Sequence, residues 1–347
     1  MATLPIAITQ GDPAGIGPEI IAKAFRDAPD VTRGCFVAGD VATLRRAAKI
    51  ITGPGQVGLP VTEIRTASEA LEVPPRCIPV LPVLQAPELV QVGVISASAG
   101  RMAADCVTWA ARAALRGDIA ALVTAPLHKE ALAAAGVDFP GHTELLQAEA
   151  AAHLGRPVQE VPVRMMLAND ELKTVLVSIH LSLREAIAAV TTDNVLQTLR
   201  LTHEFLLRTS TPGQTRRRIG VAGLNPHAGE GGLFGREELD IILPAMEQAR
   251  REGIDVQGPF APDTVFMRAR ARDAQPGEFD VVVAMYHDQG LIPVKYLGVE
   301  KGVNVTIGLP LVRTSPDHGT AFDIAGTGQA DASSLIEAIR MARQLAL

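Results

Sequence analysis

Cysteine is scarce in this sequence, with 3 among 347 residues. Cys35, Cys77 and Cys106 are odd in number and far apart, and no CxxC pair is present. These features exclude a disulfide-rich miniprotein and a cysteine-based zinc knuckle. We therefore expect reduced, mostly buried thiols in a cytoplasmic protein.

Long hydrophobic runs are missing as well. No uncharged stretch approaches the roughly 20 residues that are needed to cross a bilayer. The first residues also lack a basic segment followed by an apolar one, the pattern of a secretory signal. We therefore expect a soluble protein without a membrane partner.

The sequence also has no excess of positive charge. Lys and Arg number 32 against 38 Asp and Glu, which gives a formal net charge of -6. This balance provides no global electrostatic reason to bind nucleic acid. The best basic cluster, Arg216, Arg217 and Arg218, has no aromatic residues between its members, so we interpret it as the solvated start of a strand. We expect no nucleic-acid partner.

Short apolar runs alternate with helical patterns along the whole chain, and its length suits about two domains. Strands are predicted at residues 4–9, 35–39, 119–124, 163–167, 172–180, 218–224, 280–285 and 302–309. Helices are predicted at 98–116, 182–190 and 332–345, and Asp40 is placed to cap another that runs to residue 50. The Pro-rich residues 53–93 predict an extended excursion or an antiparallel edge hairpin. This alternation favours an α/β fold with largely parallel strands covered on both faces.

Three histidines occupy one repeated position in this pattern. His180, His227 and His287 each follow a buried-strand pattern at its carboxyl end, where open α/β sheets gather ligands and catalytic groups. Three neutral imidazoles with one open position form a catalytic metal site. The alternative for each histidine is a hydrogen-bonded structural role, and their wide sequence spacing does not decide between the two.

Two glycine clusters lie between a predicted strand and a helix, residues 11–17 and residues 229–235. Bare backbone amides at a helix N-terminus suit a phosphate or pyrophosphate, which makes Gly229, Gly231 and Gly232 candidate cofactor-binding residues. Neither cluster matches the dinucleotide fingerprint GxGxxG. The alternative is a pair of tight turns that need a positive φ.

A third group is polar and cationic. His142 and Thr143 open an apparent helix, so their side chains and amides could hold an anion. Lys295, Asn304 and Arg313 recur nine residues apart beside predicted strands. Their convergence on one phosphate is a hypothesis, and the alternative is that each is an ordinary edge residue. No GxSxG elbow and no Walker A motif is present, which disfavours serine hydrolysis and ATP chemistry.

Six motifs in a fixed order resemble the 4-hydroxythreonine-4-phosphate dehydrogenase family of pyridoxal phosphate biosynthesis, and the resemblance covers essentially the whole chain. They span residues 9–19 (TQGDPAGIGPE), 124–129 (TAPLHK), 141–144 (GHTE), 224–231 (LNPHAGEG), 286–290 (YHDQG) and 313–321 (RTSPDHGTA). Several motifs in the right order are far more specific than any single one.

The resemblance implies two α/β/α domains flanking a cleft, as in the isocitrate and isopropylmalate dehydrogenases. By analogy we expect a first domain of residues 1–127 plus 305–347. Residues 128–304 would form the second domain, carrying most of the metal and NAD site. The resemblance also implies a homodimer whose metal site lies at the subunit interface, with one histidine supplied by the partner.

Residue roles follow from the same resemblance. His180, His227 and His287 match the family's divalent-metal ligands. The family's substrate-binding positions match His142, Thr143, Lys295, Asn304 and Arg313. The cofactors implied are NAD or NADP and a divalent metal, with zinc the natural partner of three imidazoles and cobalt, nickel or magnesium as alternatives. Lys129 and Asp288 are the candidates for the general base, and a structural role is the alternative for Asp288.

The implied reaction oxidises the secondary hydroxyl of 4-hydroxythreonine 4-phosphate, and the 3-oxo acid product then decarboxylates to 3-amino-2-oxopropyl phosphate. The motifs at residues 124–129 and 165–170 look more like a paralogous branch, whose members resemble dehydrogenases for D-threonate or D-erythronate 4-phosphate. A further relative oxidises cis-dihydrodiols of aromatic acids such as terephthalate. A non-catalytic sugar-phosphate-binding module is the alternative from another class.

Overall fold

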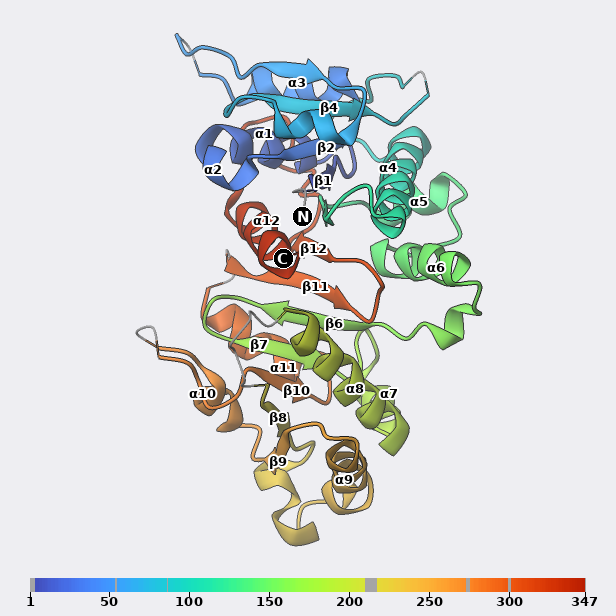
Figure 1. The fold of residues 1–347 in the computed structure, drawn as a ribbon, viewed down its shortest axis with the longest axis vertical. Helices are drawn as coiled ribbons and strands as arrows, with labels where there is room; N and C mark the ends of the chain where they lie inside the picture. The colour runs from blue at the N-terminus through green and yellow to red at the C-terminus, as the bar shows by residue number, and fades with distance from the viewer. Residues whose placement is uncertain are drawn as a thin grey trace. The chain divides into compact units, whose positions relative to one another are not determined.

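The computed structural model describes residues 4–53, 55–85, 87–209, 217–272, 275–298 and 301–346 (Figure 1). Arg216, part of the basic cluster considered above, lies outside these residues. The chain forms two compact units, Met1–Val161 together with Leu309–Leu347, and Pro162–Gly308. Both units are α/β, which confirms the predicted fold class. The residue ranges of the units are not those of the expected domains, whose boundaries stay a prediction.

The first unit contains six strands in the order β3-β4-β2-β1-β5-β12, and every neighbouring pair in this order is parallel. Their bounds are β1 (Ile6–Thr9), β2 (Cys35–Gly39), β3 (Val61–Glu63), β4 (Ile78–Pro82), β5 (Ala121–Thr124) and β12 (Arg313–Pro316). The central strands β1, β2 and β5 are buried along their whole length, as expected for parallel strands covered on both faces.

Helices cover both faces of this sheet. On one face α1 (Gly17–Asp27) packs with α3 (Val41–Ile50) and α12 (Ser333–Leu345), and on the other α4 (Ala97–Arg116) packs with α5 (Lys129–Ala134) and α6 (His142–Leu154). The remaining elements of this unit are short, namely α2 (Pro29–Thr32), η1 (Ala67–Leu71) and η2 (Val158–Glu160). Asp40 accepts a hydrogen bond from the Thr43 amide (2.7 Å), which confirms the predicted cap of α3.

The Pro-rich stretch at residues 53–93 differs from its prediction as an antiparallel hairpin. Strands β3 and β4 within it are parallel, with Val61 opposite Ile78, and the 3₁₀ helix η1 lies in the connection between them. A parallel pair needs a crossover connection, and about a dozen residues between the strands provide one. The hairpin expectation was therefore wrong.

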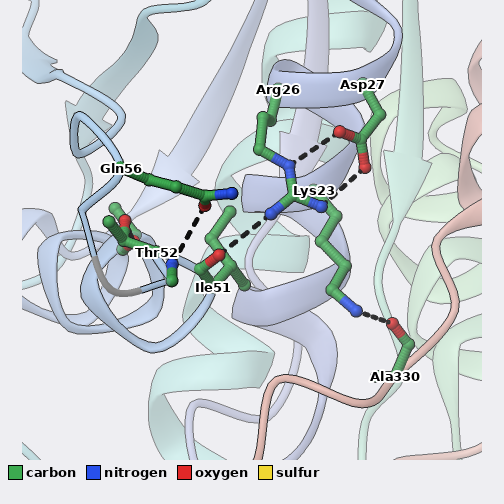
Figure 2. A network of polar contacts seen from close by, with 9 residues as sticks. Lys23, Arg26, Asp27, Ile51, Thr52, Gln56 and Ala330 are labelled. Carbon is green, nitrogen blue, oxygen red and sulfur yellow. Dashed lines mark hydrogen bonds and ion pairs between the residues drawn. The ribbon is translucent and has the colours of Figure 1, made fainter.

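The C-terminal part of the first unit is fastened to α1 by buried and half-buried polar contacts. The buried carboxylate of Glu19 accepts the backbone N–H groups of Gly326 and Gly328. Lys23 Nζ donates to the carbonyl oxygen of Ala330 (2.6 Å), and Figure 2 shows this bond beside the ion pair of Arg26. These hydrogen bonds attach residues 326–330 to α1, although the two segments are about 300 residues apart in sequence.

The second unit contains strands in the order β11-β6-β7-β10-β8-β9. The pairs β11–β6 and β6–β7 are antiparallel, while β7–β10, β10–β8 and β8–β9 are parallel. Their bounds are β6 (Arg164–Ala168), β7 (Lys173–Leu176), β8 (Ile219–Ala222), β9 (Val256–Phe260), β10 (Val281–Ala284) and β11 (Val303–Ile307). Four neighbouring parallel strands, β7, β10, β8 and β9, therefore direct their carboxyl ends to one edge.

Helices cover the second sheet on both faces as well. α10 (Val265–Ala269) and α11 (His287–Tyr296) pack on one face, and α8 (Thr192–Thr209) and α9 (Leu243–Arg251) on the other. The remaining elements are α7 (Leu183–Ala189), the 3₁₀ segment η3 (Pro226–Gly232) and the π-helical turn η4 (Glu238–Ile242). The three cysteines are buried and unbonded to one another, as predicted. Among the described residues, no helix is both long and apolar enough to span a membrane.

Candidate active site

The three predicted metal ligands follow three neighbouring parallel strands of the second unit. His180 comes after β7, His287 begins the helix after β10, and His227 comes after β8. The strand order β7-β10-β8 places the loop of His287 between the other two. The common position that the sequence predicted at strand ends is therefore confirmed, and it is the edge at which parallel α/β sheets bind ligands.

Two of these imidazoles lie together. The ring centroids of His180 and His287 are 5.7 Å apart, and both side chains line a cavity of ≈ 360 Å³ with Ser178, Tyr286 and Asp288. His287 Nδ1 lies 2.7 Å from Asp288 Oδ1, in a carboxylate–imidazole pair. A proton held on Nδ1 by the carboxylate leaves Nε2 with a lone pair for a metal or substrate. This contact is the geometry of a carboxylate that orients an imidazole, and the role of Asp288 stays a prediction.

The third imidazole has different surroundings. The ring of His227 lies 6.2 Å from that of Phe234, and no group of three or more His, Cys, Asp or Glu within the described ranges is arranged to hold a metal ion. Two imidazoles, one oriented by a carboxylate, are donors that suit a borderline metal such as zinc. The donor chemistry at this edge fits the predicted metal, whereas a complete ligand set is not formed among the residues that the structure describes.

The loop that carries His227 has an unusual backbone. His227, Ala228, Gly229, Glu230 and Gly231 all have positive φ, between 43° and 78°. A non-glycine residue costs about 1–2 kcal/mol in this left-handed region, and His227, Ala228 and Glu230 all incur this cost. His180 also has a φ of 52°. Such strain persists only where the surroundings determine the conformation, and it gathers at functional sites.

Two side chains connect these loops, Gln289 in the first turn of α11 and Ser178 after β7, and neither was predicted as a site residue. Gln289 Nε2 donates to the carbonyl oxygen of Gly223 (2.7 Å), and its Oε1 accepts the amide of Met285 (2.7 Å). Buried Ser178 donates to the Met285 carbonyl (3.0 Å). Side-chain hydrogen bonds thus connect β7, β10 and β8 in addition to the backbone hydrogen bonds between the strands. Gln289 lies within the motif at 286–290, but hydrogen-bond partners more than 60 residues away leave no local pattern.

The glycines predicted to bind the cofactor belong to the strained loop. Gly229, Gly231 and Gly232 have φ of 78°, 65° and 97°. A Cβ on Gly229 would lie 2.7 Å from a Glu238 carboxylate oxygen, whereas one on Gly231 would meet nothing within 4 Å. The positive φ and the close carboxylate are each a reason for glycine at position 229. The contact with the cofactor stays a prediction for all three glycines.

In the first unit, Arg313 is buried, and the half-buried His142 lies within reach of its charge. Arg313 is 4% exposed, and its Nε and Nη2 donate to Thr124 Oγ1 at 3.1 and 2.7 Å. Burial lowers the pKa of Arg313 to about 10, which leaves the guanidinium charged at neutral pH. Burial and the nearby Arg313 charge hold the pKa of His142 well below its ordinary 6.5, so the imidazole is neutral.

The helix N-terminus beside this group has unused donors. His142 and Thr143 are the first residues of α6, as predicted, and Gly141 before them provides no side-chain cap. The His142 Nε2 atom is shielded from solvent and has no hydrogen-bond partner among the described residues. A buried guanidinium and helix-terminal amides that lack a side-chain cap together suit an anionic ligand.

The other two predicted substrate residues belong to the second unit. Lys295 is half-buried in the last turn of α11, and Asn304 is half-buried in β11 opposite Leu167 of β6. Their convergence with His142, Thr143 and Arg313 on one phosphate stays a prediction.

Lys129, a candidate base, is exposed at the start of α5. Two groups near it were missed. Asp12 is fully buried, its Oδ1 accepts the Ala14 amide (2.9 Å), and Oδ2 has no partner among the described residues. Burial raises the pKa of Asp12, against the opposing effects of the Ala14 amide and His128. The ring of His128 stacks on Phe322 at 4.9 Å.

Imidazoles after the carboxyl ends of parallel strands in one unit, and a buried guanidinium at the start of a strand in the other, are typical of an α/β enzyme that handles an anionic substrate. The chain matches the family described as pyridoxal phosphate biosynthetic protein PdxA over residues 31–342. It is 52% identical over 341 residues to a 4-hydroxythreonine-4-phosphate dehydrogenase of Beijerinckia indica, covering 98% of this chain and 95% of the relative.

Two further matches extend this result. A D-threonate 4-phosphate dehydrogenase of Salmonella typhimurium is 47% identical over 356 residues and covers 100% of both chains. The crystal structure of a 4-hydroxythreonine-4-phosphate dehydrogenase from Klebsiella pneumoniae has a TM-score of 0.86 and 41% identity, covering 99% of this chain and 100% of its own. The chain belongs to the PdxA family, and it is an oxidoreductase that acts on a CH–OH group.

Proposed function

We propose that the protein catalyses the metal-dependent, NAD- or NADP-linked oxidation of the secondary hydroxyl of 4-hydroxythreonine 4-phosphate. The name of the Beijerinckia relative supports this substrate. The observation that carries the proposal is the pairing of His180 with His287 at 5.7 Å, beside the strand end that carries His227.

His180, His227 and His287 would hold a divalent metal, for which zinc is our first choice and cobalt or magnesium the alternatives. When bound, such a metal acts as a Lewis acid that lowers the pKa of a coordinated hydroxyl. Asp288 fixes the tautomer of His287 through its 2.7 Å contact with Nδ1. As the resemblance implies, we infer a homodimer in which one imidazole comes from the partner subunit.

Arg313 would bind the substrate phosphate, with the uncapped amides of His142 and Thr143 beside it. Two N–H groups of Arg313 are fixed on Thr124 Oγ1, so its guanidinium is oriented before the ligand arrives. Preorganised charge positions the reacting carbon without paying for reordering of the side chain. Lys295 and Asn304 are proposed as further substrate contacts.

The reaction moves a hydride from the hydroxyl-bearing carbon to the nicotinamide, while the hydroxyl proton passes to a base. Because Asp288 contacts His287, we propose Lys129 rather than Asp288 as the base that accepts this proton. The 3-oxo acid formed then loses carbon dioxide, since its carbonyl accepts the electron pair of the broken bond as an enolate, and protonation of that enolate by water gives 3-amino-2-oxopropyl phosphate. The glycines at 229, 231 and 232 are proposed to contact the cofactor. We also propose a cytoplasmic location, as is usual for metabolic enzymes such as the dehydrogenases that this chain resembles.

The second candidate substrate is D-threonate 4-phosphate, which the full-length match to the Salmonella typhimurium enzyme favours. Both substrates present a phosphate to Arg313 and a secondary hydroxyl for oxidation. The deciding experiment compares kcat/KM for the two compounds with the purified protein, following NADH and NADPH formation. Turnover of neither compound by fully metal-loaded protein would refute the proposal.

A further inference from the structure

The strained loop that carries His227 is anchored by one buried carboxylate. Glu238, the first residue of the π-helical turn η4, is 2% exposed. Its Oε1 accepts the backbone amides of Leu224 and Asn225, each at 2.7 Å, and its Oε2 accepts Asn225 Nδ2 at 3.0 Å. A buried carboxylate needs such partners, because desolvation of an unpaired charge is very unfavourable.

The same carboxylate fits against the far end of the loop. Cβ atoms on Gly223 and Gly229 would lie 3.0 and 2.7 Å from the two Glu238 oxygens. Glycine at both positions leaves the carboxylate the space that it occupies. Glu238 therefore contacts the chain before His227 through hydrogen bonds and the chain after it through van der Waals packing.

We propose that Glu238 is a positioning residue for metal binding, which holds the loop of His227 in its left-handed conformation before the metal arrives. The inference rests on the proposed function of His227 as a ligand. His227 is exposed, and its own φ of 52° is unfavourable. Without the carboxylate, the loop would relax toward right-handed conformations and move the imidazole away from the other ligands.

The hydrogen bond that Glu238 Oε2 accepts from Asn225 Nδ2 makes Glu238 hard to replace. Glutamine keeps one carbonyl oxygen for the two backbone amides, but its NH₂ group would face the NH₂ group of Asn225, where Glu238 now accepts a hydrogen bond. We therefore expect Glu238→Gln to have a smaller defect than Glu238→Ala. Gly229→Ala should displace the carboxylate from the opposite side of the loop.

The experiment titrates Zn²⁺ alone into chelator-treated, full-length protein by calorimetry. We expect Glu238→Ala to weaken Zn²⁺ binding by about 10- to 100-fold, the usual effect of losing an outer-shell partner, with Glu238→Gln and Gly229→Ala in between. Asp240→Asn is the matched control, because Asp240 lies in the same turn but is exposed and paired with Arg236. Its affinity should stay within about twofold of wild type.

The outcomes separate the two claims. Wild-type protein that binds no Zn²⁺ would refute the zinc site on which the inference rests, whereas folded Glu238 variants with wild-type affinity would refute the positioning role. A lowered melting temperature without a change in affinity would also overturn it, since that result describes structural support alone. If the variants do not fold, hydrogen exchange of metal-free wild type decides: slow exchange at the Leu224 and Asn225 amides is expected, and exchange at the solvent rate would contradict preorganisation.

Discussion

Replacement of Arg313 by alanine should impair binding of phosphorylated substrates selectively. The guanidinium is 4% exposed and remains charged at neutral pH with a pKa of about 10, so a dianionic group beside it is poorly screened by water. Hydrogen bonds to charged groups contribute about 1.5–3 kcal/mol each. Because about 1.4 kcal/mol corresponds to a factor of ten, we expect KM to rise roughly 10- to 150-fold.

The assay compares KM for D-threonate 4-phosphate and for D-threonate, which lacks the phosphate, with wild type and variant. KM for the unphosphorylated compound should change by less than about threefold, since it loses no charge-assisted bond. Thr124→Val, which removes the oxygen that orients the guanidinium, should give a smaller but equally selective effect. Arg112→Ala is the control, because Arg112 is an exposed arginine paired with Glu149. Equal losses for both compounds would refute the assignment.

Three further predictions concern stability and orientation. Because the pKa of His142 is lowered on folding, the unfolded chain binds a proton below pH 6.5 that the folded chain does not, so this residue lowers stability below pH 6.5 and not above it. The free energy of unfolding should therefore decrease by up to about 1.4 kcal/mol for each pH unit below 6.5. His142→Gln should reduce this pH dependence. Gly100→Ala would place a Cβ against the Ala131 carbonyl between α4 and α5, so its melting temperature should drop by several degrees. Asp288→Asn should weaken Zn²⁺ binding about tenfold by freeing the tautomer of the adjacent histidine, and an unchanged affinity would remove its orienting role.

Local patterns were enough to predict eight of the strands and the positions at which the three histidines follow them, whereas β3, β4, β9 and β12 were not predicted. Thr9, Thr124 and Ala284 end fully buried four-residue strands, because consecutive apolar residues bounded by turns have few other folds available. The cap of Asp40 and the start of α6 at His142 were also predictable, because residues next to a helix start carry a local sequence signal. Placing the three histidines at strand ends needed only this information.

The partners of those residues could not be predicted in this way. The contact of Gln289 with Gly223 and that of Thr124 with Arg313 join residues 66 and 189 positions apart. Nothing in the sequence marks Glu238 as buried either, since it lies between Glu237 and an exposed leucine in an acidic stretch. The direction of β3 was missed because a short, half-exposed strand carries little hydrophobic pattern. Tertiary hydrogen bonds and edge strands are set by the assembled sheet, not by local sequence.

The proposed function requires a metal at the histidine strand ends for oxidation. The most direct test follows NADH formation from D-threonate 4-phosphate and 4-hydroxythreonine 4-phosphate, with untreated protein, chelator-treated protein and treated protein resupplied with Zn²⁺. We predict turnover that chelator abolishes and Zn²⁺ restores, and no restoration in His180→Ala or His287→Ala. Full turnover of either substrate after complete metal removal would refute a metal-dependent oxidation.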